Sequence, residues 1–149
     1  MTATPVTVIR PMLLDDYGAV RRLLERTSRI QLRDADSFEG IARYLARNPG
    51  MSFVAWAGGS VTGCVFGGHD GRRGYLHHLA VALEFRRRGI GRSLVAHALA
   101  ALSADGIEKF HIDVFAGNEE GLRFWQAAGW HERCELKRLS HILSARSNC

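Results

Sequence analysis

The sequence of 149 residues lacks long apolar runs and has only three prolines. No segment approaches the roughly 20 apolar residues that a membrane-spanning helix needs, so we expect no membrane partner. The first nine residues lack a charged region followed by an apolar one, and no secretory signal is predicted. With 46% hydrophobic and 23% charged residues, the composition is typical of one globular domain, which we expect to span residues 1–149.

Cysteines are few and unsuited to metal or disulfide chemistry. Cys64, Cys134 and Cys149 are an odd number, are widely spaced and form no Cys-x-x-Cys pair. They predict neither a disulfide framework nor a zinc site, and they suit a reduced, cytoplasmic protein. The seven histidines show no metal-binding spacing, so we expect no metal.

Lysine is almost absent, yet the chain is basic. Lys109 and Lys137 are the only lysines, and arginines give most of the formal net charge of +5. Excess arginine indicates either nucleic acid or a phosphate-bearing ligand as partner. The aromatic residues fall mostly on apolar faces rather than among the arginines, which argues against nucleic acid.

Hydrophobic periodicity predicts an α/β domain. We expect strands over residues 6–10, 52–57, 61–66, 75–81 and 110–115, one or two more from residue 130 onward, and helices that begin near residues 16 and 37 and span 90–104 and 119–128. Gly58-Gly59 predicts a hairpin, residues 67–74 a glycine-rich loop, and residues 75–115 a parallel strand–helix–strand unit. The result is a single-domain mixed, mostly antiparallel sheet with helices on both faces.

One segment carries a clear chemical signal. Residues 79–94 read as a strand that ends, a turn with Arg86, Arg87, Arg88 and Gly89, and a helix that begins within the turn. Free N–H groups and the dipole at a helix N-terminus form an anion site, and glycines allow the backbone to close on a diphosphate. The turn matches neither the P-loop pattern nor the dinucleotide-binding pattern.

The chain resembles the GNAT superfamily of N-acetyltransferases in two motifs. Arg86 to Gly91 is similar to its pattern Gln/Arg-x-x-Gly-x-Gly/Ala, and Asn118 to Trp130 is similar to its pattern Asn-x-x-Ala-x-x-Leu/Phe-Tyr-x-x-x-Gly-Phe/Tyr. The motifs occur in the family's order and at its usual distance. The resemblance covers about residues 5–143 and is closest to small stand-alone bacterial members.

The resemblance implies a GNAT fold with a splayed central pair of strands and acetyl-coenzyme A as co-substrate. In the family, the strand before the turn pairs with the pantetheine arm and stabilises the oxyanion, the turn holds the pyrophosphate, and an asparagine caps the last helix. The cofactor-binding residues in matching positions are Leu79, Ala80, Val81, Arg86, Arg87, Arg88, Gly89, Ile90, Gly91, Arg92, Asn118 and Trp125.

The proton-transfer residues are less clear. Trp125 stands where many members have a tyrosine that protonates the leaving thiolate, and an indole N–H is a poor proton donor. The amine substrate must lose a proton, because an ordinary amine has a pKa of about 10. Asp113 matches a carboxylate that serves as base in some protein N-terminal acetyltransferases. His77 and His78 alternate along the splayed strand, which should turn one of them to the active site, and we take His78 as the second catalytic candidate.

The expected activity is direct transfer of acetyl to a primary amine in a ternary complex. The acceptor, whether a small molecule, a protein N-terminus or a lysine, is left open, as is an acyl group larger than acetyl. The alternative is a non-catalytic sensor of acyl-coenzyme A with the same fold. A homodimer is an alternative to a monomer for a protein this small, although no heptad pattern or apolar interface stripe in the sequence supports it.

Overall fold

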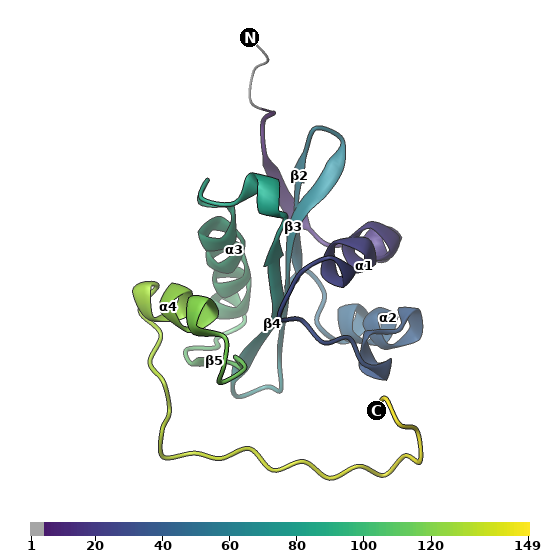
Figure 1. Cartoon of the computed structure of the whole chain (residues 1–149), viewed down its shortest axis with the longest axis vertical. Helices are drawn as coiled ribbons and strands as arrows, with labels where there is room; N and C mark the ends of the chain where they lie inside the picture. The colour runs from purple at the N-terminus through teal and green to yellow at the C-terminus, as the bar shows by residue number, and fades with distance from the viewer. Residues whose placement is uncertain (1–4) are drawn as a thin grey trace.

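The computed structural model describes residues 5–149 and consists of one open sheet with helices on both faces (Figure 1). Five strands lie in the sheet in sequence order, β1-β2-β3-β4-β5. They are β1 (Val8–Pro11), β2 (Phe53–Ala57), β3 (Ser60–His69), β4 (Gly74–Val81) and β5 (Phe110–Ile112). Every neighbouring pair is antiparallel except β4 and β5, which are parallel as predicted.

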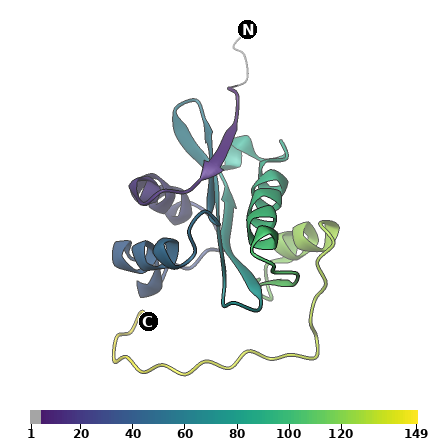
Figure 2. The ribbon, with the colours of Figure 1, turned by 180° about the vertical axis from the view of Figure 1, so that it is seen from behind.

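Two pairs of helices cover the two faces of the sheet (Figures 1 and 2). On one face lie α1 (Tyr17–Glu25) and α2 (Phe38–Arg47), and on the other α3 (Ile90–Ala104) and α4 (Glu119–Ala127). Three short 3-10 helices precede α1, α2 and α3, namely η1 (Leu14–Asp16), η2 (Asp34–Asp36) and η3 (Leu83–Phe85). Within residues 5–149, no helix is both long enough and apolar enough to cross a membrane.

Each face has its own apolar core, as amphipathic helices on a sheet require. Leu23 of α1 packs with residues of β2 and β3 on one face, and Leu94 and Leu102 of α3 lie in the core of the other. All three side chains are essentially fully buried. The fold class predicted from the sequence is therefore confirmed.

The β2–β3 connection has the predicted form, whereas the β3–β4 connection does not. Gly58 and Gly59 both have positive φ, as a tight hairpin turn requires. The loop expected over residues 67–74 is wrong: β3 continues to His69, and the turn is only residues 70–73. Gly67 lies within β3 and pairs with Leu76 of β4. The strand requires glycine at this position because a Cβ atom would collide with the Met51 carbonyl oxygen.

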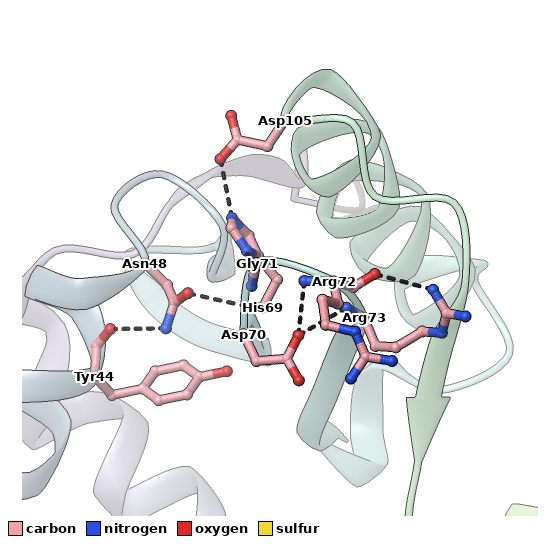
Figure 3. Close-up of polar contacts among 8 residues, drawn as sticks. All are labelled: Tyr44, Asn48, His69, Asp70, Gly71, Arg72, Arg73 and Asp105. Atoms are coloured by element: carbon pink, nitrogen blue, oxygen red, sulfur yellow. Dashed lines mark hydrogen bonds and ion pairs between the residues drawn. The ribbon is translucent and has the colours of Figure 1, made fainter.

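Side-chain hydrogen bonds fix this short turn (Figure 3). The Asp70 carboxylate accepts from the backbone N–H groups of Arg72 and Arg73, each at 2.8 Å. His69 Nε2 lies 3.1 Å from the Asp105 carboxylate, and its backbone N–H donates to Asn48 at 3.0 Å. The turn is thereby tied both to the end of α2 and to the end of α3, and the polar residues of the expected loop have structural partners.

The strands expected from residue 130 onward are not formed. Residues 128–149, all of which the structure describes, contain no strand and run from the end of α4 past β5 toward α2 (Figure 2). Their apolar residues Leu136, Leu139, Ile142 and Leu143 do not recur at every second position, so they form no apolar strand face. Ion pairs hold this segment, from Arg138 to Asp113 and from Arg146 to Asp34.

An ion pair between Asp16 and Arg10 joins β1 to the start of α1. The Arg10 guanidinium donates to both carboxylate oxygens at 2.8 and 2.7 Å, and the Leu13 N–H donates at 2.8 Å. The hydrogen bond from Arg10 lowers the pKa of Asp16, against the opposing effect of burial. A carboxyl group with a lowered folded-state pKa contributes stability above its unfolded pKa of about 3.9, and this stability is lost as the pH falls through the folded pKa.

Asp16→Asn is therefore expected to lower the free energy of unfolding at pH 7, and the difference from the wild type should shrink below about pH 4. Urea unfolding at a series of pH values measures it. Stability curves that stay parallel from pH 7 to acid conditions would show that Asp16 contributes nothing through its charge.

Candidate active site

A cleft of about 600 Å³ opens where β4 and β5 separate. The two strands pair only over Gly74–Leu76 and Phe110–Ile112, so the rest of β4 has no partner on that side. This is the predicted splayed pair. The residues that line the cleft lie in five segments, 27–31, 76–81, 85–92, 112–115 and 118–125.

A β-bulge at His78 shapes the wall of the cleft. Cys64 pairs with Ala80 and Phe66 with His77, so two residues of β4 oppose the single Val65 of β3. His78 has φ of 50°, in the left-handed region that a histidine rarely adopts. Bulges of this kind redirect side chains near active sites. The expectation that His77 and His78 face opposite sides is wrong, because both rings lie beside aromatic rings of the core under α1 and α2, His77 6.2 Å from Tyr44 and His78 6.0 Å from Phe66.

One end of the cleft forms a cationic cradle at the N-terminus of α3. Gly89 caps the helix with φ of 78° and no side-chain hydrogen bond, which leaves the N–H groups of the first turn free for an anion. Arg86, Arg87 and Arg92 line the cleft around this turn. Gly89 borders open space, since a Cβ built there would have no neighbour within 4 Å, and a Cβ at Gly91 would lie 3.5 Å from the Phe124 ring. This end fits a pyrophosphate.

Arg88 has a different position from its neighbours. Its guanidinium donates to the Glu84 carbonyl oxygen at 3.2 Å and lies 4.9 Å from the centre of the Phe85 ring. The side chain therefore packs on η3 and does not line the cleft. All other predicted cofactor-binding residues do line it, and their predicted contacts remain predictions.

Asn118 and Trp125 of the second motif lie on the wall opposite β4. Asn118 caps α4, its side chain accepting from the Gly121 N–H at 3.0 Å. Trp125 is buried, with its ring against those of Phe124 and Trp130. An indole thus lies in the cleft at the position where the resemblance implies a tyrosine.

The two catalytic candidates differ in their surroundings. His78 is 23% exposed, and its Nε2 lies 2.8 Å from the Asp36 carboxylate. Asp113 is 63% exposed, follows β5 rather than lying in it, and is paired with Arg138 at 2.7 Å. Burial lowers the pKa of the neighbouring His77. The lining of the cleft therefore combines the cationic cradle at the start of α3 with two histidines of β4 and the carboxylate of Asp113 after β5.

The resemblance implies that the segment after the first helix, with its arginines between Arg21 and Arg33, lines the acceptor site, but the sequence did not predict the contacts that this α1–α2 connection makes. Arg29 lines the cleft with φ of 68°, and its guanidinium donates to the Gly117 carbonyl oxygen at 2.7 Å, across 88 residues of sequence. Asp36, expected only to begin a helix, contacts His78 from the same connection. No local pattern could indicate either contact, because each joins residues far apart in the chain.

Comparison with known proteins identifies the class. The sequence model of the acetyltransferase (GNAT) family matches residues 17–130, so the chain belongs to this family. An acetyltransferase of Pectobacterium atrosepticum is 35% identical over 134 residues, which is 90% of each chain. The protein is an acyltransferase, as predicted.

Solved structures agree on the fold. Ard1 from Thermoplasma volcanium has a TM-score of 0.73 at 22% identity and covers 83% of this chain and 81% of its own. The PaiA N-acetyltransferase from Thermoplasma acidophilum, solved in complex with coenzyme A, has a TM-score of 0.73 at 17% identity, with 83% and 88% covered. The GNAT fold implied by the two sequence motifs is confirmed.

Proposed function

We propose that the protein transfers the acetyl group of acetyl-coenzyme A directly to a primary amine within a ternary complex. The observation that carries the proposal is that one cleft is lined both by the cradle at Gly89 and by His78 at the bulge of β4. A pyrophosphate in the cradle would lay the pantetheine arm along the unpaired part of β4. The thioester would then lie near the bulge, within reach of an amine from the opposite end.

The acceptor nitrogen must lose two protons, and the thiolate must gain one. The ammonium of the acceptor gives one proton to His78 Nδ1, and the free amine attacks the thioester carbonyl carbon and forms the new C–N bond. A backbone N–H of the splayed strand stabilises the oxyanion. Collapse of the tetrahedral intermediate breaks the C–S bond, the nitrogen gives up its second proton to water, and the thiolate that leaves takes up a proton from water. The buried Trp125 supplies none, and a thiol with a pKa of about 8.5 needs little assistance to leave.

Cysteine chemistry does not support a covalent acyl-enzyme. Cys64 is fully buried, and burial raises the pKa of its thiol to about 12. Cys134 and Cys149 are exposed, and no cysteine is among the described residues that line the cleft. Free surface thiols suit a reducing compartment, so a cytoplasmic location belongs to the proposal.

We assign Asp113 a role other than that of the base: its carboxylate attracts a cationic acceptor. Its carboxylate lies at the acceptor end of the cleft and is too exposed, and too closely paired with Arg138, to serve well as a base. The acceptor is then a small amine, an amino acid, an aminoglycoside or a peptide N-terminus, all of which carry an ammonium group at pH 7.

Calorimetric titration with acetyl-coenzyme A is the first test. Micromolar binding followed by coenzyme A release with an amine from a panel of these four classes is the expected result. Initial velocities should then give intersecting double-reciprocal lines, since parallel lines would indicate an acyl-enzyme. Tight binding without release for every amine would favour the alternative, an acyl-coenzyme A sensor, for which Trp125 is the specific argument. No binding to the folded protein would overturn both.

A further inference from the structure

Asp36 and His78 form a hydrogen-bonded pair behind the wall of the cleft. Asp36 ends η2, in the connection between α1 and α2, and His78 lies at the bulge of β4, 42 residues further along the chain. The Asp36 carboxylate is 14% exposed, and Asp36 is not among the residues that line the cleft, whereas His78 is. A ligand in the cleft would therefore meet His78 and not Asp36.

The Asp36 carboxylate is fixed by the structure around it. Its second oxygen accepts from the Arg33 N–H at 2.9 Å, and its backbone carbonyl accepts from the Tyr17 hydroxyl at 2.9 Å and from Arg21 at 3.1 Å. Burial acts to raise the pKa of Asp36, but the hydrogen bonds from His78 and Arg33 outweigh it and hold the pKa below the ordinary value. The group is ionised at neutral pH and accepts from the imidazole.

We propose that Asp36 is a positioning residue that holds the His78 imidazole with Nε2 protonated and leaves Nδ1 as the proton acceptor for the amine. The inference rests on the proposed function and assigns it one further residue. Within residues 5–149, His78 Nδ1 makes no hydrogen bond. Because an ionised carboxylate only accepts, the proton of the neutral imidazole must lie on Nε2, and the lone pair on Nδ1 is free.

Other charged groups lie around the Asp36–His78 pair. Arg21 of α1 acts on Asp36, while Asp113 and its partner Arg138, which lie beyond β5, act on the neighbouring His77. Arg29 shares the lining of the cleft. Among residues 5–149, only Asp36 contacts a ring nitrogen of His78, at 2.8 Å, so its removal is expected to have the largest effect on which ring nitrogen carries the proton.

Asp36→Asn tests the proposal, with Asp34→Asn as the matched control. Both carboxylates belong to η2, but Asp34 pairs with Arg146 and does not contact His78. The substrate is the amine that the wild type acetylates fastest. With it, Asp36→Asn should lower kcat at least about tenfold, as loss of an orienting carboxylate does. Binding of acetyl-coenzyme A should not change. Asp34→Asn should match the wild type throughout.

A measurement without turnover separates this inference from the proposed function. The His78 ring is followed by ¹⁵N-detected NMR titration of the free protein, assigned with His78→Asn. We expect the neutral ring to carry its proton on Nε2 in the wild type and in Asp34→Asn, and to lose this preference in Asp36→Asn. A neutral wild-type ring protonated on Nδ1, or the same tautomer in all three proteins, would overturn the role of Asp36 even in an active enzyme. If no amine is acetylated, the proposed function fails and the titration still decides whether Asp36 controls His78.

Discussion

Gly91→Asp is expected to weaken acetyl-coenzyme A binding at least about 100-fold while the protein stays folded. Gly91 lies in the first turn of α3, where the cradle requires room and positive charge. A carboxylate there would face the pyrophosphate and occupy the N–H groups that should bind it. The same carboxylate interacts favourably with the N-terminus of the helix dipole, so the helix itself should gain stability.

Two further measurements make the result specific. A Cβ at Gly91 would lie 3.5 Å from the Phe124 ring, an ordinary contact, and position 91 has no positive φ. Gly91→Ala therefore serves as the matched control and should bind acetyl-coenzyme A within a few-fold of the wild type. Thermal unfolding should show Gly91→Asp at least as stable as Gly91→Ala. Wild-type affinity in Gly91→Asp, measured by calorimetry, would show that the pyrophosphate binds elsewhere.

His78→Asn is expected to lower kcat about 100-fold with little change in the affinity for acetyl-coenzyme A. The substitution removes the proton acceptor and keeps a side chain that tolerates the left-handed conformation at this position better than most. The kinetic comparison uses the amine with the highest kcat/KM and a pH at which the wild type is fully active.

Asp113→Asn provides the contrast. Because this carboxylate is exposed and paired with Arg138, its loss should raise KM for a cationic amine more than it lowers kcat. The reverse pattern, a larger loss of kcat in Asp113→Asn than in His78→Asn, would assign the proton acceptor to Asp113. Together the two variants decide between the two catalytic candidates that the sequence identifies.

Local signals in the sequence were sufficient for most of the fold. The helix over residues 90–104 is formed with the predicted bounds, because its apolar face, the glycine turn before it and Asp105-Gly106 after it all agree. Gly58-Gly59 correctly predicted the β2–β3 hairpin, because both glycines adopt the positive φ that the tight turn requires. The anion cradle could also be predicted, since it uses a turn and the helix that follows it directly.

Features that depend on distant contacts could not be predicted. The bulge at His78 arises from the register of β3 on β4, which no spacing within β4 reveals. The Asp36–His78 pair joins two elements that touch only in the folded chain. Gly67 and Gly68 resemble loop residues in sequence, yet they serve the close approach of neighbouring segments to β3. Each of these three features therefore depends on tertiary packing.

The two walls of the cleft differ in how well they tolerate substitutions, because one of them is formed by the α1–α2 connection. The wall formed by β4 and α3 is part of the sheet and the apolar core, and substitutions there would disturb the whole domain. The opposite part, residues 27–31, lies in a connection without regular structure that is joined across the cleft by the Arg29–Gly117 hydrogen bond. Loops of this kind tolerate variation in sequence and length. If the proposed function holds, redesign of amine selectivity should therefore begin with this connection, where new side chains can be introduced while the proposed coenzyme-binding wall is kept.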